Sequence, residues 1–431
     1  MSEESVLNAA ALDPLFKPHE EPTSHRVKSA KDGKSVVKGR RPWNIVIAQN
    51  LRAAVREWRE SFYVGASDTT RHLFEYWFER SHRMTTEAGD EHDFRYYFCQ
   101  KEAVETYVYL HEIRKLTCLS QIVAEFGGPH AEVAAQGITD DEDAWSRMAF
   151  KLATGAGKTK CMSLCMVLSY FHAMRESDSD LARHFVLIAP NLTVYERLKD
   201  DFGGGKIFDT DPLIPAEWKG DWNLSVVLQD EASGASTGGT LYLTNIHRLY
   251  DTSKRKGKDG ENYAWAEPNV SKSKALDTGT ALRDRITSHA RVMVFNDEAH
   301  HVWDPESAWN EAVGYLHTTI KARTDGGLTA QMDFSATPKD NHGRIFKHVV
   351  CDTPLGEAVD AGIVKTPVIG RAGEKLKETP SDNAAVRYET HFAWVMNAGR
   401  KASKNGRIAA RKRCCSSCAK TPLPPTRLHN G

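Results

Sequence analysis

The sequence predicts an α/β domain in which a parallel sheet carries helices on its faces. From about residue 95 to 345, short apolar β-like runs alternate with helix-like segments, which is typical of parallel strands joined by crossover helices. A glycine-rich loop, Ala153 to Thr159, follows one such run, Met148 to Leu152, and opens an apolar segment of helical length. Another apolar run ends in the adjacent carboxylates Asp297 and Glu298. These features together predict the fold.

Composition limits the classes of function. The 431 residues contain 57 Lys and Arg and 57 Asp and Glu, so no overall basic field draws the chain to nucleic acid, and any such contact has to be local. No apolar run is long enough to span a bilayer, and the polar, acidic start carries no secretory signal, so we expect a cytoplasmic protein without a membrane partner. Cysteines near apolar residues are expected to be buried reduced thiols: Cys99, Cys118, Cys161, Cys165 and Cys351.

Residues 1–90 predict a small α+β lead-in, with a short β-rich start followed by helix. Leu51 to Phe78 places apolar and aromatic residues near helical spacing, which indicates core packing and not a ligand site. Two later segments are expected to lie outside the regular elements. Gly203 to Gly239 is loop-rich, and Asp251 to Ala275 is polar and basic, which suits either a solvated insertion or a contact with a phosphate backbone.

The glycine loop is the strongest candidate for a phosphate site. Gly155 and Gly157 let the backbone turn so that successive N–H groups face one anion, and the following helix adds its own unpaired N–H groups. We expect Lys158 to reach the β- and γ-phosphates and the Thr159 hydroxyl to bind Mg²⁺. The strict pattern has glycine where this chain has Leu152, and a plain glycine-rich turn before a helix is the alternative. The expected nucleotide ligands are Thr154, Gly155, Ala156, Gly157, Lys158 and Thr159.

The carboxylates of the second motif complete the expected site. Since ligands sit at the carboxyl ends of parallel strands, Asp297 is expected to meet Mg²⁺ beside Thr159, and Glu298 to orient and deprotonate a water molecule. A solvated acidic turn is the alternative, and the pairing with the glycine loop disfavours it. A third strand end carries Ser335 and Thr337, whose hydroxyl groups can bond the acidic motif.

The order of these motifs resembles the first RecA-like motor domain of superfamily 2 helicases and translocases. A glycine loop ending G-K-T precedes D-E-A-H and then S-A-T. Three further segments resemble motifs of the type III restriction enzyme Res subunit family and its DEAD/DEAH-box relatives: Tyr97 to Thr106, Phe185 to Leu198 and Leu241 to Tyr250. The resemblance covers about residues 95–370. The segment G-R-R-P-W-N and the aromatic-rich, helix-like stretch that follows to Phe78 also resemble the family's lead-in.

The resemblance implies an ATP- and Mg²⁺-dependent motor on double-stranded DNA, with a modification methyltransferase subunit as a further partner. Lys158, Asp297 and Glu298 would be its catalytic residues. Gln100 would read the adenine edge through its amide, and His300 would couple nucleotide state to Ser335 and Thr337. The residues implied to face the DNA backbone are Pro190, Asn191, Thr244 and Asn245.

The expected domains are the lead-in (1–90), a RecA-like ATP-binding domain (91–350) and the start of a connection to a second motor domain (351–399). The sequence after residue 370 contains no Q-x-x-G-R-x-x-R motif, no second strand–helix series and no nuclease-like carboxylate pair. We therefore expect the front portion of a longer motor. A nucleotide-binding remnant without turnover is the leading alternative. An ATPase unrelated to DNA is a further one, which the two DNA-facing motifs disfavour.

Residues 400–431 form a basic, proline-containing tail. Cys414, Cys415 and Cys418 lack a matching C-x-x-C or histidine pair, so a four-ligand zinc site is not expected. Codons allowed for Arg411 to Gly431, read one nucleotide earlier, can spell an apolar strand, an acidic turn and a helix. We expect a frameshifted, disordered remnant that binds no stoichiometric metal.

Overall fold

The computed structural model describes residues 13–27, 35–85, 89–229, 231, 237–249, 281–301, 308–340 and 342–365. The chain forms two compact units, one spanning Leu15–Val364 and the other joining Met1–Pro14 to Lys365–Gly431. Every candidate site residue lies in the first unit. The expectations for the basic segment 251–275, for the connection beyond residue 365 and for the tail with Cys414, Cys415 and Cys418 lie outside the described residues.

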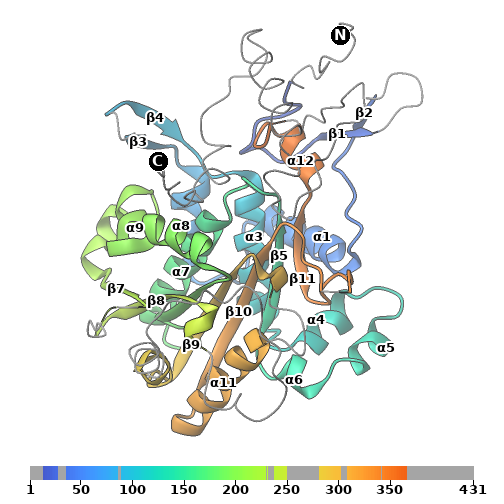
Figure 1. Cartoon of the computed structure of the whole chain (residues 1–431). Helices are drawn as coiled ribbons and strands as arrows, with labels where there is room; N and C mark the ends of the chain where they lie inside the picture. The colour runs from blue at the N-terminus through green and yellow to red at the C-terminus, as the bar shows by residue number, and fades with distance from the viewer. Residues whose placement is uncertain are drawn as a thin grey trace, which may run out of the picture. The chain divides into compact units, whose positions relative to one another are not determined.

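A seven-stranded sheet organises the first unit, and all its strand pairs are parallel, which confirms the predicted fold class (Figure 1). Its strand order is β11-β5-β10-β9-β6-β8-β7. The strands are β5 (Arg147–Leu152), β6 (His184–Ala189), β7 (Leu224–Leu228), β8 (Gly239–Asn245), β9 (Arg291–Asp297), β10 (Gly327–Ser335) and β11 (Val349–Thr353).

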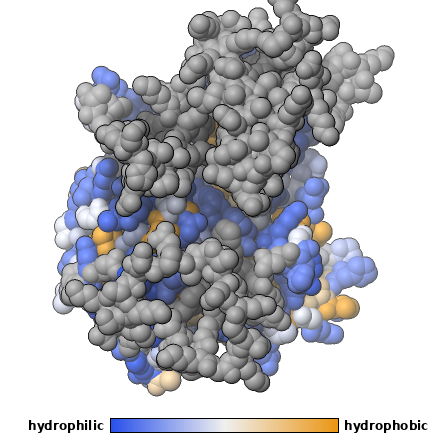
Figure 2. Space-filling view, in the orientation of Figure 1, coloured by the Kyte–Doolittle hydropathy of each residue, from blue (hydrophilic) through white to orange (hydrophobic). Residues whose placement is uncertain are grey.

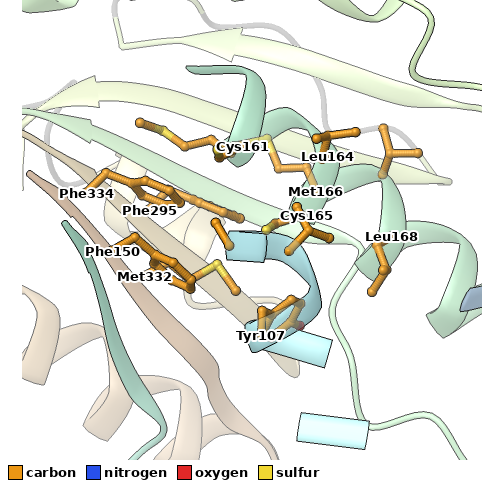
Figure 3. Close-up of a cluster of buried hydrophobic side chains, with 14 of the residues drawn as sticks. Tyr107, Phe150, Cys161, Leu164, Cys165, Met166, Leu168, Phe295, Met332 and Phe334 are labelled. Carbon is orange, nitrogen blue, oxygen red and sulfur yellow. The ribbon is translucent and has the colours of Figure 1, made fainter. Parts of the chain in front are cut away.

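Helices pack against both faces of the sheet. Since successive side chains of a strand point to opposite faces, alternate residues join different apolar clusters. In β9, Met293 and Phe295 join the apolar cluster formed with helices α3 (Phe98–Val108) and α7 (Lys158–Arg175). Val292 and Val294 join a second cluster, with α11 (Ala308–Arg323). Figure 3 shows side chains of α7, such as Leu164 and Cys165, gathered beside Phe295 and other aromatic rings of the sheet. The central strand β9 therefore carries apolar side chains to both faces of the sheet, and α7 follows the glycine loop directly.

The lead-in contains the short strands and helices that the sequence predicted. Two antiparallel pairs, β1 (Ser24–Val27) with β2 (Ser35–Lys38) and β3 (His82–Thr85) with β4 (Glu91–Phe94), flank two helices. In α1 (Val46–Glu60), buried Ala48, Leu51, Val55 and Trp58 recur at helical spacing. Helix α2 (Asp68–Phe74) is capped by Ser67, whose hydroxyl accepts a bond from the Thr70 N–H at 3.1 Å. The aromatic stretch is core packing, as expected.

The remaining elements are short. The α-helices are α4 (Leu119–Phe126), α5 (Ala131–Gln136), α6 (Asp140–Asp143), α8 (Leu192–Phe202), α9 (Lys206–Thr210) and α12 (Leu355–Asp360). The π and 3₁₀ turns are η2 (Glu75–Glu79), η3 (Tyr109–Ile113), η4 (Gly203–Gly205), η5 (Ala216–Asp221), η6 (Ile246–Arg248) and η8 (Ala299–His301).

The structure differs from the sequence-based expectation at one loop-rich stretch and at one domain boundary. The stretch Gly203–Gly239, expected to be loop-rich, contains α9, η5 and the edge strand β7. Strand β7 is only five residues long and mostly half-buried, so its apolar run is too short to stand out in the sequence. Residue 350, the expected end of the motor domain, lies inside β11, which pairs with β5, and the unit continues through α12 to Val364.

The described surface is mostly polar (Figure 2), and the described cysteines are free thiols. On the face shown in Figure 2, the described residues are mostly hydrophilic, with hydrophobic side chains in separate patches. In the described part of the chain, no helix is long and apolar enough to cross a membrane. The cysteines described are free thiols; Cys118 is partly buried and the others, Cys99, Cys161, Cys165 and Cys351, are buried. Burial raises the pKa of Cys99 to about 12, so this thiol stays protonated at neutral pH.

A buried ionic cluster fastens the lead-in to the sheet unit. We call it the arginine junction: Arg40, Arg52 and Arg59 with Glu102, Glu105 and Glu357. The Arg40 guanidinium donates two bonds to Glu102, at 2.5 and 2.6 Å, and one to Glu357 at 2.8 Å. Burial alone would raise the pKa of Glu102, yet Arg40 beside it brings that pKa below its ordinary value. Since Glu102 belongs to α3 and Glu357 to α12, the junction links three distant segments of the chain.

Candidate active site

Three adjacent strand ends meet at one edge of the sheet. Strand β10 lies between β5 and β9, with Ser335 opposite Lys151 and Phe334 opposite Asp297. The glycine loop leaves the end of β5, and Asp297 is the last residue of β9. Because parallel strands end on the same side, the loop, the carboxylates and the S-A-T segment converge as the sequence indicated.

The glycine loop has the backbone that a phosphate cradle requires. Gly155 and Gly157 have φ angles of +88° and +83°, in the left-handed region that side chains disfavour. A Cβ atom at Gly157 would lie 2.3 Å from the Gln100 Nε2 atom, so the close packing here also requires glycine. Lys158 is the first residue of α7, whose N-terminus therefore faces the same space.

Gln100 lies against the loop, at the start of α3. Its side chain is buried, with the residue 1% exposed. Its Nε2 donates to the Ala156 carbonyl at 3.0 Å, and its Oε1 accepts a bond from the Tyr97 N–H at 2.9 Å. Both ends of the amide are thus engaged within the protein, one of them with the glycine loop.

Each carboxylate of the acidic motif is paired with a cation. The Lys158 Nζ donates to Glu298 Oε1 at 2.5 Å, and Arg197 of α8 donates to Asp297 Oδ2. Glu298 adopts a φ of +50°, a left-handed conformation that is uncommon for a residue with a side chain, and its N–H donates to Asp297 Oδ1 at 3.0 Å. Backbone strain of this kind tends to persist where surrounding contacts fix a functional group.

Burial sets the electrostatics of this edge. Asp297 is fully buried, and burial raises its pKa above the ordinary range, while the positive charges of Arg197 and Lys158 act against that shift. The site therefore contains two carboxylates and two cations that neutralise each other.

The third motif lies beside the acidic motif. His300 Nδ1 is 3.1 Å from Ser335 Oγ and 3.6 Å from Glu298 Oε2. The Thr337 N–H donates to the same Ser335 hydroxyl at 3.0 Å. A continuous chain of contacts therefore runs from Glu298 to the S-A-T segment. Its coupling role stays a prediction.

A cavity of about 280 Å³ opens next to the loop, and sequence reasoning missed it. Its lining residues are Gly157, Thr159, Lys160, Asp201, Lys206, Ile207, Thr210 and Asp211. The Lys160 ammonium bonds Asp211 and lies 5.1 Å from the centroid of the Phe94 ring. Most of the lining comes from α8, α9 and the turn after α9, which carry no recognised motif. In the sequence, only the lining residues at the glycine loop, Gly157 and Thr159, pointed to this place.

The residues implied to face DNA are not equally accessible. Thr244 and Asn245 are 0% and 4% exposed, and Pro190 is buried, so their side chains present little surface to a DNA backbone in this structure. Asn191 is exposed and caps α8 by accepting a bond from the Val194 N–H at 2.9 Å. Arg197, two turns further along α8, was missed because no pattern links it to Asp297 in sequence.

The residues present fit a magnesium nucleotide. Gly155 and Gly157 hold the left-handed backbone that a phosphate-binding turn needs, and Lys158 opens α7 directly after them. Asp297 is a buried carboxylate at the end of β9, and Thr159 is a half-buried hydroxyl residue at the start of α7. Carboxylate and hydroxyl oxygens are the ligands that Mg²⁺ prefers.

The parallel sheet, its crossover helices and the loop after β5 define a RecA-like α/β domain. A family profile described as type III restriction enzyme, res subunit, matches residues 93–340, more than half of the chain. The chain therefore belongs to this family, as its motif order predicted, and contains the family's ATP-dependent, helicase-like motor domain. Domains of this family typically use ATP with Mg²⁺, and the family implies interaction with DNA. A search of curated proteins found no significant match.

Proposed function

We propose that this chain binds ATP with Mg²⁺ at the carboxyl edge of the sheet and hydrolyses it as a motor acting on double-stranded DNA. The observation that carries the proposal is the convergence of the glycine loop, Lys158, Asp297 and Glu298 at adjacent strand ends. Family membership supports the motor class. By the same membership we propose a modification methyltransferase subunit as a partner.

In the proposed site, Lys158 and the backbone of residues 154–159 bind the phosphates. Thr159 and Asp297 would hold Mg²⁺, which neutralises phosphate charge when bound. Lys158 leaves Glu298 for the phosphates, which frees the Glu298 carboxylate to accept a proton from water. The water oxygen attacks the γ-phosphorus, and the bond to the β–γ bridging oxygen breaks, giving ADP and phosphate.

The nucleoside is proposed to lie in the 280 Å³ cavity, which adjoins Gly157 and Thr159. Gln100 does not line this cavity but lies against Ala156 and Gly157 beside it, and it remains the candidate for reading adenine. To do so, its Nε2 would exchange the Ala156 carbonyl, 3.0 Å away, for the base. His300 would report nucleotide state through Ser335 and Thr337.

We propose DNA contact through Asn191 and the start of α8, because this is the exposed part of the candidate DNA surface. Pro190, Thr244 and Asn245 lie behind it and would contribute through local rearrangement. Contacts of this kind position a strand without reading its sequence. Binding without turnover is the second candidate function, and the pairing of Glu298 with Lys158 is the observation that favours it.

Titration with a fluorescent ATP analogue in Mg²⁺ tests the nucleotide site. We expect Lys158→Ala to weaken binding about tenfold or more, since it removes charge-assisted bonds to phosphate. Lys347→Ala is the matched control, because Lys347 pairs with Glu142 at 2.9 Å elsewhere on the surface. Equal affinities of the wild type and Lys158→Ala would contradict the proposal. Hydrolysis with and without duplex DNA then separates a motor from a binding protein.

A further inference from the structure

The two carboxylate oxygens of Asp297 have different hydrogen-bond partners, and Arg197 is one of them. Asp297 Oδ1 accepts the Glu298 N–H at 3.0 Å, and Oδ2 accepts the Arg197 guanidinium. Both oxygens of this buried carboxylate therefore have a partner within the protein. A direct metal bond to Oδ2 would bring a divalent cation against a guanidinium, and like charges at that distance repel strongly.

The two cations of the site differ in their freedom to move. The Lys158 side chain is 9% exposed and lies at the N-terminus of α7. The Arg197 side chain is 52% exposed, whereas that of Asp297 is 1% exposed. A long side chain that is half in water can leave its partner at small cost, because water replaces the lost bonds. Arg197 is thus the cation that can leave its carboxylate for water, whereas Lys158 leaves Glu298 only for the phosphates.

We propose that Arg197 is a positioning residue that serves as the resident counter-ion of Asp297 and is displaced when Mg²⁺ binds. This inference rests on the proposed nucleotide function. Without metal, Arg197 offsets the charge of the buried carboxylate and fixes its Oδ2 atom by a hydrogen bond. With metal, the same arginine competes for Oδ2 and so raises the Mg²⁺ concentration that nucleotide binding requires.

Displacement of Arg197 from Asp297 would also release the link between α8 and the end of β9. Arg197 belongs to α8, which begins at the exposed cap Asn191. While Arg197 holds Asp297, the middle of α8 is tied to the end of β9. Metal binding releases that tie, so a ligand at the start of α8 and a metal at Asp297 act on one helix.

The test is a Mg²⁺ titration of fluorescent nucleotide binding to the full chain. We expect Arg197→Gln to lower the Mg²⁺ concentration at half-maximal binding about three- to fivefold, the scale of an exposed ion pair. Lys199→Gln is the matched control: it removes one positive charge from the same helix, where Lys199 lies 3.8 Å from Glu196 at the surface. Its midpoint should equal that of the wild type. In EDTA, Arg197→Gln should bind nucleotide no more tightly than the wild type.

Several outcomes would overturn the proposal. An unchanged midpoint in Arg197→Gln shows that Arg197 does not compete with the metal. A higher midpoint shows that it is a ligand of the nucleotide instead. Arg197→Lys keeps the charge but loses the planar fork, so its midpoint should lie between those of wild type and glutamine variant, and a value below the latter contradicts the proposal. Failure of the proposed function is seen separately, as equal binding by Lys158→Ala.

Discussion

Arginine–carboxylate pairs occur in two regions of the molecule. The carboxylates are buried in both regions, but the arginine is buried in one and half-exposed in the other. In the arginine junction, the side chains of Arg40, Glu102 and Glu357 are 11%, 2% and 5% exposed. At the strand-end site, Arg197 is 52% exposed although its partner Asp297 is 1% exposed. The partners are chemically the same, and the difference lies in whether water can replace the arginine.

This difference separates a structural pair from an exchangeable one. When both partners are buried, loss of one leaves an uncompensated charge in a medium that solvates it poorly. When one partner is half in water, the pair contributes little to stability and can be replaced by another cation. The junction therefore fixes α3, and with it Gln100 beside the glycine loop, while the strand-end site stays open to ligands.

The largest expected effect is on stability, from breaking the junction. Arg40→Ala should lower the free energy of unfolding by about 3–5 kcal/mol, because Glu102 and Glu357 lose their closest cation in a buried site. Arg52 remains, but only at 3.7 Å from Glu102 and 3.3 Å from Glu357. Chemical denaturation followed by circular dichroism measures this. Arg56→Ala is the matched control, since Arg56 is 60% exposed and pairs with Glu60 at 3.1 Å on the same lead-in. Equal losses in the two variants would show that burial does not distinguish these pairs.

The next effect concerns chemistry at the strand ends. Glu298→Gln should slow ATP hydrolysis about a hundredfold or more, because an amide cannot accept the proton of the attacking water. Nucleotide affinity should not fall, since the variant frees Lys158 for phosphate. Steady-state hydrolysis and nucleotide titration measure the two quantities. Glu60→Gln, on the exposed face of α1, is the control. An unchanged rate in Glu298→Gln would assign the base to another residue.

The sequence predicted the parts of the site that lie at strand ends. Loops after strands are placed by topology, so a glycine loop after β5 and carboxylates ending β9 have to meet once the strands are parallel and close together. Local chemistry thus located Lys158, Thr159, Asp297 and Glu298. The near-continuous apolar runs of β5, β6 and β9 likewise predicted a sheet covered on both faces.

The sequence could not predict pairings between distant segments. Arg197 reaches Asp297 across 100 residues, and Arg40 reaches Glu357 across 317. Charged residues on a helix are usually solvated, and nothing local separates Arg197 from its neighbour Lys199. The sequence could not predict the burial of Thr244 and Asn245 for a similar reason. Their burial depends on the residues that pack over the end of β8 and not on the pattern of β8 itself.

The smallest expected effect is on stability, from removing Arg197, and it compares the exposed arginine pair directly with the buried one. Arg197→Gln should change the free energy of unfolding by less than about 1 kcal/mol in the absence of nucleotide, although it breaks the same kind of pair as Arg40→Ala. Water reaches the vacated side of Asp297 through the space that Arg197 occupied, and Lys158 remains to offset its charge. Denaturation under the conditions used for Arg40→Ala, with Lys199→Gln as the control, gives the comparison. A loss as large as that of Arg40→Ala would mean that Arg197 holds the strand-end site together and is not free to exchange with a metal.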